Sequence, residues 1–454
     1  ISIQIIFSNN KTTKIDIPKL NVETDNTQSF QRFSAALNVD DRPVLSFISE
    51  DQSISKQASN GGVGQRVTPY STGFLSVTEF PLHLLSNVLP ERLSSTLPQW
   101  FQEVLLYEKT TRQSYLNGEF WLDFSHQDQL SVIAKTTAQL SLSSLKNKNK
   151  PLAVDMFVQS TLDKYSNLSV ALDDIVIDEQ KVLLNDVVFS KEGEVALLKI
   201  KSVNVESWSS WLQSRLSLPA QVSDTLAKLS LEGVFSEVQV VLNDESISQS
   251  IVSANVKGFA IEAFDNIPGF KNVDGYLETG MSSGFVNMSS QRMQFFPSVI
   301  YDNPFVFDEI SGQVAWRIDD ENNSLIVNSN VIDGQSAFGE AVGQFLLAIP
   351  LEEGHRKSEF TLHLGLKNSN ARYHRDLIPN KVPEDIRTWL ASSLRKGRVE
   401  QAGFVYRGGF SGDDNSRSFQ VFVNANETDL AYSDDWPMLS NIEGQVVVDN
   451  EYMS

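Results

Sequence analysis

Alternation of apolar and polar side chains is the feature that most restricts the fold of this chain. From Leu130 to Leu142, small or apolar residues occupy every second position, and mostly polar residues stand between them. This period of two is typical of a strand with one buried and one solvated face. Shorter stretches repeat it at 120–124, 168–172, 314–318, 360–366 and 419–423. Turn-forming clusters such as 319–323 and 412–415 separate the stretches, which predicts antiparallel meanders.

Helical periodicity occurs only in short stretches. Apolar residues recur at helical spacing from Leu82 to Trp100, from Trp208 to Leu226 and from Ile386 to Leu390, and a proline interrupts or precedes each stretch. We therefore predict a few short helices that cap or cross a mainly β structure. Trp211 and Trp389 fall on the apolar sides of two of these helices, so core packing is expected for both.

Composition removes several classes of function. A chain of 454 residues suggests roughly three structural units. The absence of Cys rules out disulfides, thiolate nucleophiles and cysteine metal sites. A formal charge of -20 opposes binding to phosphate backbones, so no nucleic-acid partner is expected. No long apolar run is present, and the strand-like start at Ile1 lacks an initiator Met. We interpret the chain as part of a longer protein whose membrane anchor lies elsewhere.

Motifs for catalysis or metal binding are missing from the sequence. The histidines stand far apart and form no ligand pattern, so surface positions are predicted for His83, His126, His355, His363 and His374. Acidic pairs and clusters fall at strand ends, which predicts solvated turns at 173–174, 319–321 and 413–414. There is no nucleophile elbow, phosphate loop or dinucleotide fingerprint. We expect no catalytic residue, no metal and no cofactor, and thus a chain that is not an enzyme.

An internal repeat is visible near the C-terminus. Thr225-Leu226-Ala227, followed by Gly233, recurs as Trp389-Leu390-Ala391, followed by Gly397. The segment 268–275, which begins Pro-Gly-Phe and ends in Gly, recurs as 437–444. A shorter Ile-x-Gly-Gln-Val echo links 310–314 with 442–446. Repeats of this size predict stacked supersecondary units.

The same segments resemble the YhdP branch of the AsmA-like family. The resemblance is carried by 266–275, by 294–297, by 305–317, by 385–399 and by 434–444, in this order and spacing. It is good from about Trp208 to Ser454 and weaker before it. The resemblance implies a periplasmic portion of a protein anchored in the inner membrane. Related proteins are bridge-like lipid transfer proteins, in which repeated β-groove units carry phospholipid acyl chains between the inner and outer membranes.

With the resemblance, we expect a mainly β fold, an elongated and twisted antiparallel sheet of repeating β-groove units that curls into an apolar gutter with a few short crossing helices. The expected units are 1–110, 111–232, 233–396 and a truncated 397–454. Phospholipids would be the partner, and both membranes would be contacted by parts of the protein outside this chain. The candidate groove residues are Phe120, Leu122, Leu130, Val132, Ala134, Leu140, Val314, Trp316, Phe360, Leu362, Leu364, Leu366, Phe419, Val421 and Val423. The alternative is an exported structural or adhesive β-sandwich with a dry core, without lipid transport.

Overall fold

The structure is a computed structural model with two compact units, which are described separately. Unit 1 comprises residues 1–203, 210–219 and 239–247, and unit 2 comprises 204–209, 220–238 and 248–454. The residues described are 2–6, 12–16, 19–26, 31–39, 42–52, 70–82, 114–126, 129–141, 145, 151–163, 168–177, 180–184, 186–192, 195–217, 220–243, 249–265, 267–351, 358–409, 417–433, 435–449 and 452–453. The four repeat units expected from the sequence stay a prediction.

Unit 1 is built from antiparallel strands that pair in chain order. Strands β1 and β2 form a separate two-stranded sheet. From β3 to β10 each strand pairs with the next, β10 also pairs with β11 and β12, and β12 pairs with β13. The bounds are β1 Ser2–Ile6, β2 Thr12–Asp16, β3 Lys19–Asn26, β4 Gln31–Val39, β5 Arg42–Gln52, β6 Tyr70–Pro81, β7 Tyr115–His126, β8 Gln129–Leu140, β9 Leu152–Asp163, β10 Leu168–Ile177, β11 Gln180–Leu184, β12 Val187–Glu192 and β13 Val195–Asn204.

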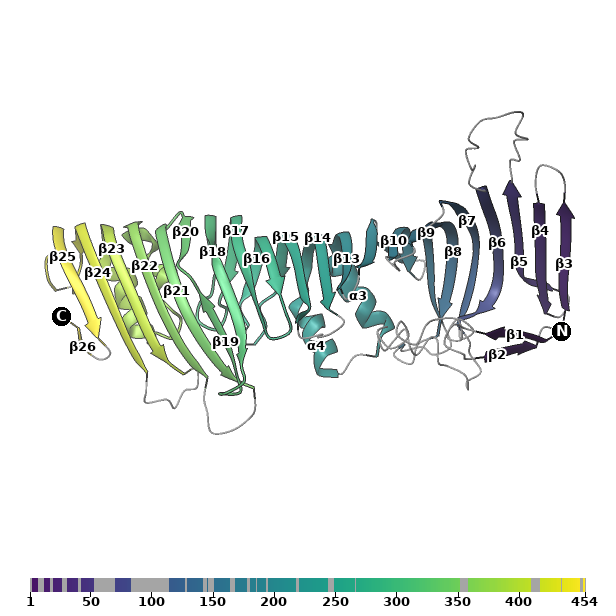
Figure 1. The fold of residues 1–454 in the computed structure, drawn as a ribbon. Helices are drawn as coiled ribbons and strands as arrows, with labels where there is room; N and C mark the ends of the chain where they lie inside the picture. The colour runs from purple at the N-terminus through teal and green to yellow at the C-terminus, as the bar shows by residue number, and fades with distance from the viewer. Residues whose placement is uncertain are drawn as a thin grey trace, which may run out of the picture. The chain divides into compact units, whose positions relative to one another are not determined.

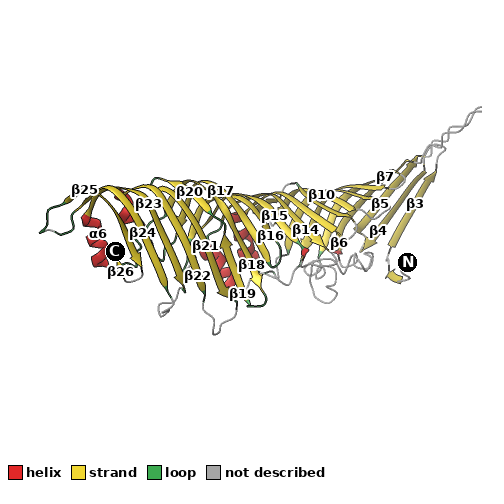
Figure 2. Ribbon diagram, turned by 60° about the vertical axis from the view of Figure 1, so that its left-hand side comes forward, coloured by secondary structure: helices red, strands yellow, loops and turns green. Residues whose placement is uncertain are grey.

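Unit 2 has the same antiparallel architecture, with strands of up to 15 residues. Strands β15 to β26 pair with their neighbours, and the long β18 faces two short strands, β19 and β20, which both pair with β21. In Figures 1 and 2 strands β15 to β25 lie side by side. The bounds are β14 Glu232–Asn243, β15 Ile251–Ile261, β16 Gly269–Thr279, β17 Ser283–Phe296, β18 Phe305–Asp319, β19 Ser324–Ser329, β20 Ile332–Ser336, β21 Gly339–Pro350, β22 Glu359–Asn370, β23 Leu394–Gly408, β24 Ser418–Leu430, β25 Leu439–Asp449 and β26 Tyr452–Met453.

Few and short helices connect these strands, as Figure 2 shows in red. They are α3 Val205–Arg215, α4 Ala220–Leu229, the 3-10 turn η3 Ala371–Tyr373, α5 His374–Leu377 and α6 Glu384–Ser393. Two of the three expected helical stretches are thereby confirmed, and the third, beyond Leu82, lies outside the described residues. None of the helices described has the length and apolarity needed to span a bilayer.

The two helical tryptophans differ from each other in burial. Trp211 of α3 is 7% exposed, in agreement with the predicted core packing. Trp389 of α6 is 37% exposed, so the same prediction was wrong there. The Trp389 indole packs edge-on against Tyr432 and donates its Nε1–H to the Tyr432 carbonyl oxygen at 3.0 Å. Helical periodicity identified the side of α6 that faces protein, but a single partner ring covers only part of the indole.

The sequence repeat corresponds to a repeated hydrogen bond within unit 2. The shift in numbering that relates Thr225 to Trp389 also relates Leu229 to Ser393, the last residues of α4 and α6. Glu262 N–H donates to Leu229 O at 2.8 Å, and Ala431 N–H donates to Ser393 O at 2.9 Å. Each bond ties a helix end to the residue that follows the second strand after it. The helix–strand–strand segment is therefore repeated in three dimensions.

The mainly β, antiparallel class predicted from alternation is confirmed. Each of the stretches 120–124, 168–172, 314–318, 360–366 and 419–423 lies inside a strand, and the long alternating segment forms β8 as far as Leu140. The turn at 319–323 is also confirmed: Asp319 Oδ1 accepts from the Asn322 backbone N–H at 3.3 Å, and Asp319 Oδ2 accepts from Asn322 Nδ2 at 3.1 Å. These bonds hold the pKa of Asp319 below its usual value. The turn predicted at 412–415 lies outside the described residues.

Candidate functional site

The pairing register sorts the side chains of unit 2 into two faces, because residues directly opposite in an antiparallel pair point to the same side. One row of neighbours across β21 to β25 is Gly343, Leu364, Phe404, Val421 and Val448. Further rows on this side are mainly apolar and uncharged, with Ser329 opposite Val314 and Thr279 opposite Gly284. We call the combined surface the apolar face of unit 2, formed by Val286, Val314, Trp316, Val327, Phe345, Leu347, Phe360, Leu362, Leu364, Leu366, Phe404, Tyr406, Phe419, Val421, Val423 and Val448.

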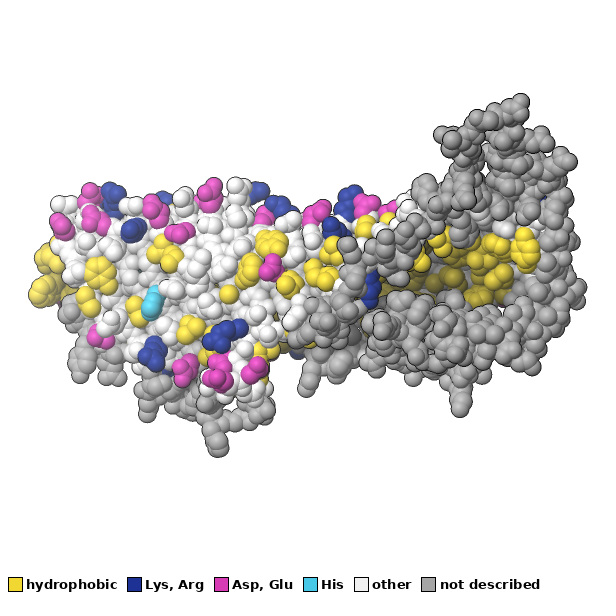
Figure 3. Space-filling model, viewed as in Figure 1, with side chains coloured by type: hydrophobic (Ala, Val, Ile, Leu, Met, Phe, Trp, Pro, Cys, Tyr) yellow, Lys and Arg dark blue, Asp and Glu magenta, His cyan; other side chains and the backbone are white. Residues whose placement is uncertain are grey.

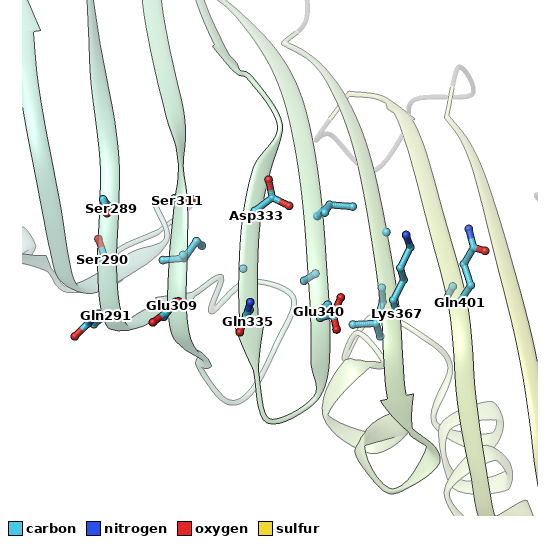
Figure 4. A pocket seen from close by; sticks show the side chains of 17 residues that line it. Ser289, Ser290, Gln291, Glu309, Ser311, Asp333, Gln335, Glu340, Lys367 and Gln401 are labelled. Atoms are coloured by element: carbon cyan, nitrogen blue, oxygen red, sulfur yellow. The ribbon is translucent and has the colours of Figure 1, made fainter.

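The opposite face of the same strands is mixed and contains all of their charged residues that alternate with the apolar rows. One row across β17 to β23 consists of Gln291, Glu309, Gln335, Glu340, Lys367 and Gln401. These side chains line a shallow hollow together with Ser289, Ser311 and Asp333, and Figure 4 shows them side by side on neighbouring strands. Figure 3 shows mostly polar and charged side chains over β15 to β25, with isolated hydrophobic ones. The predicted polar-face position of His363 is confirmed, since it pairs with Gln344 and Val405.

Unit 1 has an apolar face of its own. Register places one uninterrupted apolar row across its strands, formed by Ala35, Phe47, Leu75, Phe120, Ala134, Val158, Leu172, Val187 and Ile200. A second row passes through Leu122, Val132, Ser160 and Val170, with one polar residue. Charged residues such as Glu119 and Lys135 pair with each other on the other side of the sheet. Both units therefore have one apolar face and one mixed or polar face.

The candidate groove residues from the sequence fall on these two apolar faces. In unit 1 they are Phe120, Leu122, Leu130, Val132, Ala134 and Leu140, which register places on one side of β7 and β8. In unit 2 they are Val314, Trp316, Phe360, Leu362, Leu364, Leu366, Phe419, Val421 and Val423. Within each unit the structure brings its candidates onto a single surface. Contact with a ligand stays a prediction for all of them.

The apolar face of unit 2 is open rather than sealed. Leu364 is 45% exposed and Phe419 is 37% exposed. Strands β15 to β26 all belong to one succession of pairs, so no described strand of this unit is left to form a covering sheet. In a sandwich core such side chains would be buried. A large half-exposed apolar surface is typical of a site that binds another apolar molecule.

Bulged residues lie in six strands of the unit 2 sheet, in β15 to β17 and in β22, β24 and β25. One residue in each of several strands has a positive φ: Gly258, Asn272, Arg292, Asn368, Glu427 and Asn441. Register shifts accompany these residues between β15 and β16, β16 and β17, β23 and β24, and β24 and β25. A residue in this conformation bends its strand and re-aims the side chains that follow. We call these six residues the bulge line. The alternation pattern does not predict these bulges, although Asn and Gly inside a predicted strand are known indicators of a bulge.

Hydrogen bonds connect the bulge line from strand to strand. Asn272 Nδ2 donates to the Arg292 carbonyl oxygen at 3.1 Å, and Asn368 Nδ2 donates to Glu340 Oε1 at 3.0 Å. At one end, Asp274 Oδ1 accepts from the Gly258 backbone N–H at 2.7 Å, and Oδ2 forms an ion pair with Lys257. Burial tends to raise the pKa of Asp274, but these bonds outweigh it and the pKa lies below its usual value. Hydrogen bonds of Asn272, Asn368 and Asp274 therefore stabilise the bulged backbone.

The part of the chain that the structure describes contains no cluster of three or more His, Asp or Glu residues that would hold a metal ion. His374 lies half-buried in α5, where Nδ1 contacts the Ala371 carbonyl oxygen, so its predicted surface position was only partly right. Burial raises the pKa of the Tyr301 phenol to about 12, further from neutral pH than that of an ordinary tyrosine.

The chain matches a family model described as YhdP protein over residues 3–454. It belongs to the YhdP family. A related curated protein is the intermembrane phospholipid transporter YhdP of Escherichia coli strain K12, which is 20% identical over 181 residues. That alignment covers 39% of this YhdP-family chain and 14% of the relative, so the chain spans a small part of the length of the curated protein it matches. No solved structure matches the chain significantly.

Proposed function

We propose that this chain is a periplasmic segment of an intermembrane phospholipid transfer protein and that its apolar faces carry acyl chains. The observation that supports this most directly is the open apolar face of unit 2, whose paired residues include no charged side chain. The name of the Escherichia coli relative supports phospholipid as the cargo. Anchoring in the inner membrane and contact with the outer membrane would be supplied outside this sequence.

Transfer energetics favour an open face over a closed pocket. Each methylene withdrawn from water gains about 0.8 kcal/mol, so an acyl chain of roughly fifteen methylenes gains about 12 kcal/mol when fully covered. A lipid that moves from a bilayer to a comparably apolar surface loses the burial free energy of its acyl chain in the bilayer and regains a similar burial free energy on the protein. The free-energy change for sliding along the face is then small. The chain acts as a passive, non-catalytic track, and it needs no catalytic group.

The alternative of a dry β-sandwich predicts covered side chains. Leu364 and Phe419 retain more than a third of their exposure, which favours the track. His363 on β22 and Gln420 on β24 are the sequence neighbours of Leu364 and Phe419, and they lie on the opposite face. Substitutions at neighbouring positions can therefore test the two faces separately.

Site-specific photocrosslinking tests the proposal. A benzophenone amino acid at Leu364, Val421 or Phe360 should crosslink to phospholipid in cells, and the same residue at His363 or Gln420 should crosslink at least about tenfold less, because these side chains face water. Extracted adducts are identified by mass spectrometry. Equal lipid crosslinking from both sets would overturn the assignment of the apolar face, and absence of lipid from both would overturn the function.

A further inference from the structure

Several glycines on the apolar faces lie beneath large side chains. A Cβ added at Gly334 would lie 2.7 Å from Cδ1 and 3.0 Å from Cε1 of Phe307. At Gly343 it would lie 3.0 Å from Cδ2 of Leu364, and at Gly73 it would lie 3.1 Å from Cε2 of Phe47. Ordinary contacts of this kind begin at 3.4 Å. Each large side chain therefore lies flat against a glycine backbone instead of standing upright on the sheet.

Backbone conformation does not explain these glycines. Gly73, Gly334 and Gly343 are absent from the positions at which the described backbone has a positive φ. Any residue could adopt their extended conformation. The atoms nearest to the added Cβ belong to side chains at Gly73 and Gly334, so what requires glycine is the close approach of a ring or a methyl group.

Neighbouring side chains restrict sideways movement of the Phe307 ring at Gly334. On one side its centroid is 5.6 Å from that of Phe338, which in turn packs 5.8 Å from Phe305. On another side lies Ile310, whose Cγ1 would be 3.7 Å from the same Cβ and which is only 8% exposed. A group added at Gly334 therefore displaces the Phe307 ring from its place against the backbone.

We propose that Gly73, Gly334 and Gly343 set the free width above the apolar faces and so determine how many acyl chains fit side by side. The inference rests on the proposed function. A phospholipid brings two acyl chains and a lysophospholipid brings one. A larger side chain at these positions displaces the overlying side chain and narrows the apolar surface. The narrower surface excludes the two-chain phospholipid before it excludes the one-chain lysophospholipid. The three glycines are therefore specificity-determining residues that act through their neighbours.

Gly365 provides a matched control within the same sheet. It pairs with Val342 and Gly403, on the face opposite to Gly343. An added Cβ would lie 2.8 Å from Val342 Cγ2, a clash similar to that at Gly334, with no other atom within 4 Å. Val342 is 41% exposed and can yield toward solvent. A substitution at Gly365 repeats the local crowding without narrowing the proposed track.

The test compares two probes on the purified 454-residue chain, dioleoylphosphatidylethanolamine and the one-chain oleoyl-lysophosphatidylethanolamine, with bound lipid counted by native mass spectrometry. We expect Gly334→Leu to lower the ratio of two-chain to one-chain lipid by about tenfold, within the range that one added group produces in an apolar pocket. Gly334→Ala should lower it less, and Gly365→Leu should leave it unchanged. Circular dichroism melts verify folding. If Gly334→Leu unfolds, Gly343→Leu replaces it, since the half-exposed Leu364 can yield.

Three results decide the inference. A selective loss of the two-chain lipid in the Gly334 or Gly343 variants supports it. Unchanged loading of both lipids by these folded variants overturns it and leaves the proposed function intact. A wild-type chain that loads neither lipid overturns the proposed function, and the inference with it.

Discussion

The two faces of the unit 2 sheet share one backbone and differ in charge: the apolar face carries no charged side chain, whereas the opposite face mixes charged and polar residues with apolar ones such as Val342 and Val405. Leu364 and its neighbour His363 are both exposed, yet Leu364 belongs to a row of apolar residues and His363 pairs with Gln344. Exposure alone therefore does not identify the binding side. What distinguishes the apolar face is that its paired residues remain uncharged from strand to strand while water can still reach them. This combination is costly for a structural surface and useful for a surface that binds lipid.

The largest expected effect comes from a charge placed on the apolar face. Leu364→Asp or Val421→Asp should abolish complementation in cells that lack the native protein. An acyl chain beside the new carboxylate would strip its water at a cost of several kcal/mol. The protein should stay folded, because these side chains are not sealed in a core. Complementation and circular dichroism are measured on the same variants.

The matched substitutions are His363→Asp and Gln420→Asp, one residue away on the opposite face. Both should complement nearly as well as wild type, since their side chains already meet water. Unfolding of Leu364→Asp and Val421→Asp would contradict the open face and favour a dry core. Loss of function in the His363 and Gln420 variants would show that the two faces are not functionally distinct.

A smaller effect is expected at the bulge line, which shapes both faces. Asn368→Val should destabilise unit 2 by about 1–2 kcal/mol, because a β-branched residue is strained at positive φ, whereas Asn368→Gly should be close to wild type. Asn328 pairs with Ala315 and Leu346 in the extended part of β19, and Asn328→Val serves as the control. Urea unfolding gives the three values. Equal stability of the Val and Gly variants at 368 would argue against the bulge.

The smallest expected effect depends on pH. The folded-state pKa of Asp274 lies below the ordinary aspartate value of 3.8. The carboxylate therefore contributes stability above the unfolded pKa, and the contribution is lost as the pH falls through the folded value. Asp274→Asn should reduce stability by about 1 kcal/mol at pH 7, and the difference should vanish near pH 2. Thermal melts across this range measure it, with Asp333→Asn on the polar face as the reference. A difference that persists at low pH would mean that packing, not charge, is responsible.

Alternation made much of the fold and of the candidate site predictable. A period of two assigns every second residue to one side of a strand, so Leu362 and Leu364 were placed together without any knowledge of their partners. The bulges were not predicted, because Asn272 and Asn368 interrupt their strands by a backbone conformation that sequence only suggests. The exposure of Trp389 was also missed, since helical spacing identifies a packed side and not how much material packs against it. The role of the glycines could not be predicted, because the sequence does not show which ring lies over Gly334.

The bulge line also has a mechanical consequence. A flat sheet bends easily about an axis along its strands, whereas a sheet creased across its strands behaves like a folded plate. The strand segments on either side of the crease lie out of the plane about which the sheet would bend. Bending along the crease would therefore stretch or compress many interstrand hydrogen bonds at once. Asn272, Asn368 and Asn441 stand on this crease, each in a different strand. Where it is present, such a crease stiffens the sheet along the direction in which the strands are stacked, without a second sheet among the described strands of unit 2.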